Sequence, residues 1–391
     1  MSKQKQFIII GLLIGFLIAT IGLIFILGII LLRNPGIVQG IGIIQKTVVV
    51  PETVIVEVTP TPTQIPSPTN TIFPQSKDRI VFLSVWEKDF YIINADGTDL
   101  ARITNDGNHQ YCPIWNPDGK RISFFVPSVN QGYFDMYIMD ANGENRKFLF
   151  QAKLDTEYGQ MPIWSPDGNK LAFTAYDATG LTRIYIYDGA NIKRLTKDAE
   201  SEMFPVWSPD GTKIAYTFSN IVNNKTFYGI TSIDGVFNWL VSDLDANPFS
   251  PLTWSPDAQH LAFISGADLY IVKFFDIKSL DRRTSLISDR TFGPTWSSNG
   301  DTIAFYYLND SCCSTEVNFL SASDQNRGIQ STHEIWAYQD SAISWSRDGR
   351  HVAVVGDANT KNWNIYIVDT AGNSVKLTDS DRRDHCPKWS P

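Results

Sequence analysis

The sequence predicts an all-β fold of seven repeated, four-stranded antiparallel sheets, and three observations support this prediction. A motif close to P-x-W-S-P-D-G recurs every 42 to 49 residues, at Trp115, Trp164, Trp207, Trp254, Trp296, Trp345 and Trp389. After each of the first six motifs comes a short run rich in β-branched and aromatic residues, such as KLAFTA or KIAYTF, as expected for a strand. A spacing of this size indicates one supersecondary unit per repeat.

The turns within each repeat define four strands, which we name A to D. Ser-Pro-Asp-Gly fits a type I turn, and it joins strand A, which carries the tryptophan, to strand B. Sequences such as NADG, DANG and DTAG supply a second tight hairpin between strands C and D. Two motifs deviate, WSPDA at 254–258 and WSSNG at 296–300, and we expect slightly altered A–B turns there.

The two ends of the repeat region predict how the sheets close into a ring. Residues 79–103 contain strands B, C and D without a tryptophan motif before them, and the chain stops at CPKWSP, a strand A without a body after it. The last strand would complete the first sheet and remove an open sheet edge. The alternative, a solenoid, would need polar capping repeats. We therefore predict a seven-bladed β-propeller over residues 78–391, closed by its N- and C-terminal strands.

Two further segments precede the predicted propeller. Phe7–Leu32 is a run of 26 residues without a charge; as a helix it would be about 39 Å long, against a hydrocarbon core of ~30 Å. We predict an uncleaved signal-anchor helix within residues 1–33, and the alternative is a long signal peptide that is removed. Lys3 and Lys5 predict a cytoplasmic N-terminus, with the rest outside. Residues 34–77 are rich in Pro and Thr and predict an extended stalk.

Composition and charge exclude several classes of protein. Apolar residues make up 43% of the chain and charged residues 19%, which excludes a largely disordered chain. Residues 77–391 hold 29 of the 33 Lys and Arg residues and 39 of the 41 Asp and Glu residues, a net charge of −10 that argues against nucleic-acid binding. The sequence contains no G-x-S-x-G, H-E-x-x-H or P-loop motif, so we expect no catalytic residues and no cofactor.

The repeat also carries a family resemblance. WSPDG followed by LAF, IYIYD and a final RLT resembles the repeat of TolB-type β-propellers, which occurs too in dipeptidyl-peptidase-like and tricorn-like proteins. The resemblance covers residues 78–391 and implies the propeller fold. It implies no single role, because this fold serves many functions. TolB-type propellers usually have six blades, whereas this sequence predicts seven.

Strand direction sorts the connections onto two faces. The uniform A–B and C–D turns share one face, and the longer, more varied B–C and D–A loops share the other, which we call the loop face. Variable loops on a rigid scaffold are the usual place for recognition. A ring of polar and aromatic residues in the D–A loops predicts a ligand site at the mouth of the central channel, although a solvated mouth without a ligand is the simpler alternative. These residues are His109, Tyr111, Tyr158, Glu202, Arg290, Asp340, Arg383, Asp384 and His385.

Four cysteines lie in the propeller region. Cys112 and Cys386 each lie three residues before a motif tryptophan, so ring closure puts them at equivalent positions of neighbouring innermost strands. A disulfide between them would staple the closure, provided that their Cα atoms lie about 4.4–6.8 Å apart. Cys312 and Cys313 are adjacent in a B–C loop, as a vicinal disulfide or as free thiols.

These features predict an interaction module anchored in the cell membrane by one helix, with its propeller on the extracytoplasmic side. It would bind a protein, peptide or glycan through the loop face. The repeats leave no room for the hydrolase domain of the peptidase relatives. The alternative is a metal-assisted glycan lyase or hydrolase at the channel mouth, similar to some TolB-like enzymes that act on pectin fragments. His109 and His385, near Asp384, could hold such a metal, but a polar rim without a metal is the simpler interpretation.

Overall fold

The computed structural model describes most of the predicted propeller. The described residues are 78–107, 110–154, 161–196, 201–220, 225–235, 238–241, 251–266, 268–273, 276–282, 291–309, 314–323, 329–331, 343–356, 363–379 and 381–391. The predicted membrane helix and stalk lie outside them, as do Cys312 and Cys313. Within these ranges, no helix is long and apolar enough to cross a membrane.

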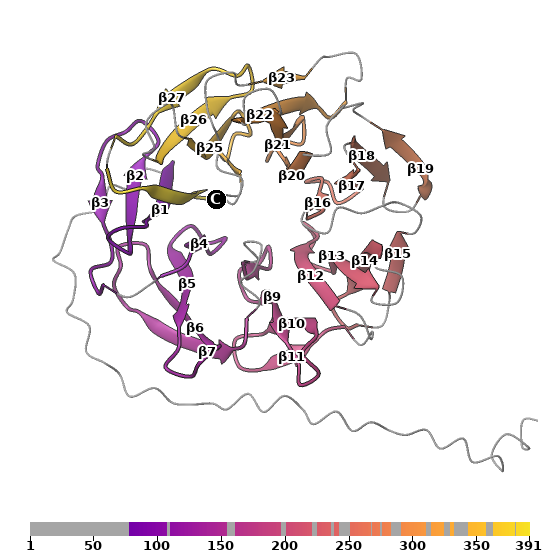
Figure 1. The fold of residues 1–391 in the computed structure, drawn as a ribbon, viewed down its shortest axis with the longest axis horizontal. Helices are drawn as coiled ribbons and strands as arrows, with labels where there is room; N and C mark the ends of the chain where they lie inside the picture. The colour runs from indigo at the N-terminus through magenta and orange to yellow at the C-terminus, as the bar shows by residue number, and fades with distance from the viewer. Residues whose placement is uncertain are drawn as a thin grey trace, which may run out of the picture. The chain divides into compact units, whose positions relative to one another are not determined.

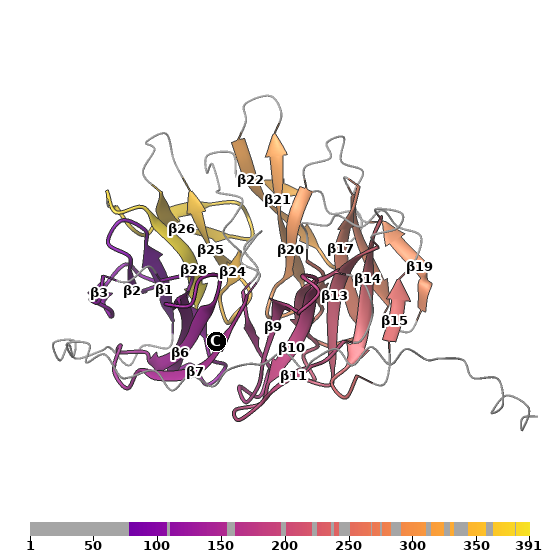
Figure 2. The ribbon, with the colours of Figure 1, turned by 60° about the horizontal axis from the view of Figure 1, so that its bottom comes forward.

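Seven four-stranded antiparallel sheets, the blades, are arranged in a ring (Figure 1), which confirms the predicted seven-bladed propeller. The first strand of each blade lies nearest the centre of the ring, and Figure 2 shows the strands running between its two faces. Blade 1 contains β28 (Asp384–Trp389), β1 (Arg79–Ser84), β2 (Asp89–Asn94) and β3 (Ala101–Arg102). Blade 2 contains β4 (Ile114–Trp115), β5 (Arg121–Pro127), β6 (Phe134–Asp140) and β7 (Lys147–Ala152). Blade 3 contains β8 (Ile163–Trp164), β9 (Leu171–Tyr176), β10 (Thr182–Tyr187) and β11 (Ile192–Arg194).

The remaining blades repeat this order along the chain. Blade 4 contains β12 (Ser201–Trp207), β13 (Lys213–Asn220), β14 (Lys225–Ser232) and β15 (Asn238–Val241). Blade 5 contains β16 (Thr253–Trp254), β17 (His260–Ser265), β18 (Asp268–Lys273) and β19 (Asp276–Arg282). Blade 6 contains β20 (Thr291–Trp296), β21 (Thr302–Asn309), β22 (Ser314–Ser321) and β23 (Gln330–Ser331). Blade 7 contains β24 (Ser344–Trp345), β25 (His351–Gly356), β26 (Asn364–Asp369) and β27 (Ser374–Lys376).

The ring closes through strands from opposite ends of the propeller. β28, at the C-terminus, pairs with β1 so that Trp389 lies opposite Ile80. Just beyond this pair, the amide of Ser390 donates to the carbonyl of Arg79 at 2.7 Å, and the amide of Arg79 donates to the Ser390 hydroxyl at 3.1 Å. The closure predicted from the two incomplete ends is confirmed, and it pairs the inner edge of β1 that would otherwise be open.

The hydrophobic core lies between the blades. The described residues form seven buried clusters, one in each interface between neighbouring blades. Between blades 1 and 2, for example, the rings of Phe90 and Phe124 meet edge to face with centroids 5.2 Å apart. Because both faces of each blade are covered, middle strands such as β2 and β10 are buried along their whole length rather than at alternate residues.

The motif tryptophans connect each blade to the one before it. The indole N–H of Trp115, in blade 2, donates to the carbonyl of Lys388 in blade 1 at 2.9 Å. Lys388 is the residue just before the motif tryptophan of its own blade. The same bond, at 3.2 Å, joins two more pairs of blades, from Trp207 to Ile163 and from Trp345 to Thr295. The tryptophan at this position is therefore a contact between blades, as its place in the repeat suggests.

The A–B turns share one hydrogen bond in all six motifs that continue into a second strand. The amide at the glycine position of W-S-P-D-G donates to the carbonyl at the serine position at 2.8–3.0 Å. The altered turns expected at 254–258 and 296–300 are not found, because Ala258 and Gly300 donate in the same way. Ala258 reaches this geometry with a φ of 58°, in the left-handed region where a Cβ costs about 1 kcal/mol.

We predict that Ala258→Gly stabilises the protein by about 0.5–1 kcal/mol, because glycine enters this region without a steric penalty. The mirror variant is Gly211→Ala in blade 4, where φ is 69° and an added Cβ would meet Pro166 at an ordinary 3.7 Å. It should destabilise by a similar amount. Urea unfolding measures both changes, and a loss of stability in Ala258→Gly would contradict the prediction.

Candidate functional site

The structure describes five of the nine residues predicted at the channel mouth. Each lies just before or at the start of an innermost strand, on the loop face, and they are Tyr111, Glu202, Arg383, Asp384 and His385. The other four, His109, Tyr158, Arg290 and Asp340, lie outside the described residues. Tyr111 packs on its own blade. Glu202 and Asp384 are buried between blades, and Arg383 and His385 lie where blades 7, 1 and 2 meet.

Tyr111 is packed against blade 2. Its ring stacks on Phe125 of β5 with centroids 4.6 Å apart and meets Phe134 of β6 edge-on at 5.3 Å. Its amide donates to the carbonyl of Phe125 at 3.1 Å. These contacts fix the half-buried ring at the loop-face end of the blade.

A threonine that follows the outermost strand bonds to strand C of its own blade in three blades and reaches the next blade in two of them, and we call this arrangement the blade latch. The threonines end the sequences RIT, RLT and KLT, and all three are buried: Thr104, Thr196 and Thr378. Each hydroxyl accepts a hydrogen bond from an amide in strand C of its own blade, at 2.8 Å from Phe90, 3.4 Å from Ile184 and 2.9 Å from Ile365. Two of the hydroxyls also reach a side chain five residues before the next motif tryptophan. The Thr196 hydroxyl donates to Glu202, whereas the Thr104 hydroxyl donates to Asp89 of its own blade at 2.9 Å and lies 3.4 Å from Gln110 Oε1.

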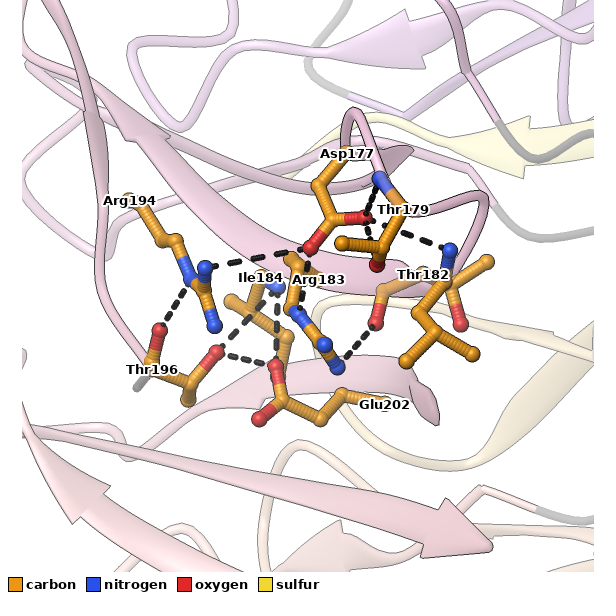
Figure 3. Close-up of polar contacts among 9 residues, drawn as sticks. Asp177, Thr179, Thr182, Arg183, Ile184, Arg194, Thr196 and Glu202 are labelled. Carbon is orange, nitrogen blue, oxygen red and sulfur yellow. Dashed lines mark hydrogen bonds and ion pairs between the residues drawn. The ribbon is translucent and has the colours of Figure 1, made fainter. Parts of the chain in front are cut away.

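Glu202 is the acidic member of the latch between blades 3 and 4 (Figure 3). It is fully buried, and its Oε2 accepts hydrogen bonds from the Thr196 hydroxyl and from the Ile184 amide, the latter at 3.2 Å. Its Oε1 has no hydrogen-bond partner among the described residues. Burial raises the pKa of Glu202 to about 7, even though these hydrogen bonds and the charges of Arg183 and Arg194 act to lower it.

A buried ion pair lies beside Glu202. Asp177, in the B–C turn of blade 3, accepts a hydrogen bond from Arg183 Nε at 3.0 Å and lies 3.8 Å from Arg194 Nη1. The side chains of Asp177 and Arg183 are only 3% and 4% exposed. The other Asp177 oxygen accepts from the Thr179 amide at 2.8 Å and shapes the turn. The two carboxylates and two guanidinium groups in Figure 3 therefore balance in charge when Glu202 is ionised.

Asp384 occupies the position of Glu202 in blade 1 and is also fully buried. Its amide donates to the carbonyl of Trp363, in blade 7, at 2.8 Å, and its Oδ1 lies 3.9 Å from Arg382 Nε. The carboxylates of Glu202 and Asp384 thus lie inside the blade interfaces and not on the surface of the channel mouth.

Arg383 lies between two tryptophans where blades 7 and 1 meet. The central carbon of its guanidinium is 5.3 Å from the ring centroid of Trp86, in the B–C turn of blade 1, and 5.3 Å from that of Trp363, just before β26. Both distances suit a cation–π interaction. Trp86 is 62% exposed, whereas Arg383 and Trp363 are half-buried. We call these three residues the Trp–Arg–Trp cluster.

Backbone hydrogen bonds hold the Trp–Arg–Trp cluster from both sides. The amide of Val85, next to Trp86, donates to the carbonyl of Arg383 at 3.0 Å, and the amide of Asp384 donates to the carbonyl of Trp363 at 2.8 Å. Arg383 has a φ of 56°, which is uncommon for a residue other than glycine. Such a conformation persists where the surrounding contacts impose it, and it is frequent at binding sites. The three side chains are therefore arranged before any ligand arrives.

Sequence reasoning missed Trp86 and Trp363. The signal that could have found them is their place outside the repeat, since the motif accounts for seven of the eleven tryptophans. A tryptophan that the repeat does not explain is a candidate for recognition. Their position on either side of Arg383 depends on the ring closure and could not be read from the spacing.

His385 and two cysteines extend the Trp–Arg–Trp cluster toward blade 2. The sulfur atoms of Cys112 and Cys386 are bonded, and their Cα atoms are 5.4 Å apart, within the range that a disulfide needs. A β-bulge interrupts the β1–β28 pairing between Val81 and Leu83, and Cys386 has a left-handed φ of 52°. His385 Nδ1 lies 3.0 Å from the Cys386 sulfur. The disulfide therefore links the closing strand of blade 1 to the segment that leads into blade 2.

The same three residues have metal-ligand chemistry. Within the described part of the chain, the candidate ligand atoms of Cys112, His385 and Cys386 lie within 4.8 Å of one another. Metals bind cysteine as the thiolate, and the disulfide removes both thiolates. The other metal pair considered from the sequence includes His109, which lies outside the described residues.

Comparison with known proteins identifies the fold. No protein-family model matches the sequence, and no curated protein matches it. Among solved structures, the chain is similar to TolB from Acinetobacter baumannii, with 20% identity, a TM-score of 0.52, and coverage of 80% of this chain and 67% of that one. It is also similar to the propeller domain of the Trilobed protease from Pyrococcus furiosus, with 15% identity, a TM-score of 0.55, and coverage of 75% and 88%. A third is an oligogalacturonate lyase in complex with manganese, with 13% identity, a TM-score of 0.54, and coverage of 69% and 77%.

These similarities support a TolB-like propeller fold and, at such low identity, nothing more specific. One topological difference is clear. The Pyrococcus domain is described as having an open Velcro topology, whereas here β28 pairs with β1 and closes the ring. The neighbours include TolB, the propeller domain of a protease and a lyase, and they share no single activity.

We predict that Glu202→Gln stabilises the protein by about 1–3 kcal/mol at pH 8 and hardly changes it at pH 4. The pKa of Glu202 is about 7 in the folded state, against an ordinary value of 4.5. The folded state therefore binds more protons between these values, and wild-type stability falls as the pH rises through this window. The glutamine removes the cost of a buried charge, which is fully present above pH 7.

Urea unfolding from pH 4 to pH 8 measures this dependence, and blade 2 offers the matched control. Gln110 is the neutral counterpart of Glu202 and is 1% exposed. Gln110→Glu should introduce a loss of stability that grows with pH, because the new carboxylate would lie beside Asp106. A pH-independent effect of Glu202→Gln would contradict the role given to burial.

We predict that Cys112→Ser destabilises the oxidised protein by about 2–5 kcal/mol, because the disulfide closes a loop that spans almost the whole propeller. Urea unfolding with and without reductant measures the change, and reductant should lower the wild type to the level of the variant. On a non-reducing gel the two proteins should migrate differently. Equal mobility would show that the disulfide does not form.

Proposed function

We propose that this protein is an interaction module, anchored in the cell membrane by its N-terminal helix, that binds a partner through the loop face of an extracytoplasmic propeller. The partner is a protein, peptide or glycan. The predicted anchor at 7–32 and the Pro/Thr-rich stretch at 34–77 support the location, because together they would carry the propeller away from the bilayer. A disulfide between Cys112 and Cys386 suits an oxidising compartment.

One observation carries the proposal: the exposed Trp86 stacked on a half-buried arginine that a second tryptophan supports. Tryptophan and arginine are the residue types most enriched at binding hot spots, where large rigid side chains contribute most of the affinity. A tryptophan that is 62% exposed contributes little to the core, so its large apolar ring suits contact with a partner. Its neighbours hold it in place, which reduces the entropy lost on binding.

The experiment is photo-cross-linking in intact cells. A photoreactive phenylalanine analogue replaces either Trp86, on the loop face, or Gln259, an exposed residue of the opposite face. We expect a discrete adduct in the membrane fraction from position 86 and none from position 259. Equal adducts at both positions, or none at position 86, would contradict a binding role for the loop face.

A further inference from the structure

We propose that Arg383 is the anchor for a carboxylate of the partner and that Trp86 is the platform for the apolar group next to that carboxylate. This rests on the proposed function and names the chemistry of the partner: a protein segment that presents an acidic side chain or its C-terminal carboxylate beside an aromatic or aliphatic side chain.

The first argument is that the guanidinium of Arg383 has donors to offer. Among the described residues it makes no hydrogen bond and no ion pair, and its Nε is buried without an acceptor. A guanidinium has five N–H donors in a fixed plane, and a desolvated donor without an acceptor is costly. A planar carboxylate satisfies two of these donors at once, in the bidentate geometry that arginine favours.

The second argument is that nearby carboxylates are engaged elsewhere. Glu87, next to Trp86 in the same turn, accepts a hydrogen bond from the Tyr91 hydroxyl. Asp384, next to Arg383, is fully buried and lies near Arg382. The guanidinium of Arg382 lies over the ring of Tyr91, so it is held away from the Trp–Arg–Trp cluster. Neither of these described carboxylates is therefore placed to accept from Arg383, which favours an acceptor supplied by a partner.

The third argument is preorganisation. Two indole rings fix the plane of the Arg383 side chain, and hydrogen bonds from Val85 and to Trp363 fix the backbone on either side. An arginine normally loses much side-chain entropy when it binds. Here that entropy is already lost in the free protein, so less of the interaction energy with a carboxylate is offset when it binds, and the affinity is higher. The exposed Trp86 then contacts whatever group adjoins the carboxylate.

The test uses two small probes that differ only in charge, N-acetyl-glycyl-tryptophan and its C-terminal amide. Isothermal titration with the full-length protein in lipid nanodiscs measures their affinities. We expect the acid to bind at least about tenfold more tightly than the amide, the size of one charge-assisted hydrogen-bonded pair. Arg383→Gln should abolish this preference, whereas Arg350→Gln, an exposed arginine of the opposite face, should preserve it.

Two further variants separate recognition from folding. Arg383→Lys keeps the charge but loses the planar fork, and it should lose most of the preference for the acid. Trp86→Ala, at a largely exposed position, should weaken both probes in parallel. Equal binding of acid and amide to the wild type, no binding of either, or an unchanged preference in Arg383→Gln would each overturn the proposal. If the wild type binds acid and amide equally but position 86 still yields its cellular adduct, the carboxylate anchor is wrong and the proposed binding face is not contradicted.

Discussion

The pairing of β28 with β1 is the constraint on which the rest of the structure depends. It brings the last residues of the chain against the first strand of the propeller, so that seven blades close without a free edge between them. The same pairing determines where residues 382–386 lie. Arg383 reaches the space between Trp86 and Trp363, and Cys386 reaches Cys112, only because the closing strand is in this register. The candidate site is therefore a product of the closure.

The repeat uses the same polar chemistry in several blades, and function is to be sought where a blade departs from it. The blade latch recurs at Thr104, Thr196 and Thr378, which identifies it as a structural device even where an acidic residue such as Glu202 takes part. Trp86, Arg383 and Trp363 have no counterpart in the repeat motif. Their cluster costs exposed apolar surface and a left-handed backbone at Arg383, and stability alone gives no reason for either.

The sequence was sufficient for the blade count, the closure and the turns, because each rests on local patterns that recur at a fixed spacing. It was not sufficient for the site. Glu202 and Asp384 look like channel-mouth residues by their distance from a tryptophan, but a β-strand buries alternate side chains and both are fully buried. Trp86 and Arg383 lie near opposite ends of the propeller sequence. Only the closed ring shows that their side chains lie against each other. At Ala258 the sequence pattern predicted an altered turn that the structure does not have, because the turn keeps its hydrogen bond with alanine in the left-handed conformation.

The central claim is that ring closure holds the Trp–Arg–Trp cluster rigid before any partner binds. Amide hydrogen exchange of the full-length protein tests it most directly, because the amides of Val85 and Asp384 donate the two bonds that hold the cluster. We expect both amides to exchange as slowly as those in the middle strands of blade 1, β1 and β2. Exchange as fast as that of an unfolded chain at Val85 and Asp384, with β1 and β2 still protected, would contradict the claim.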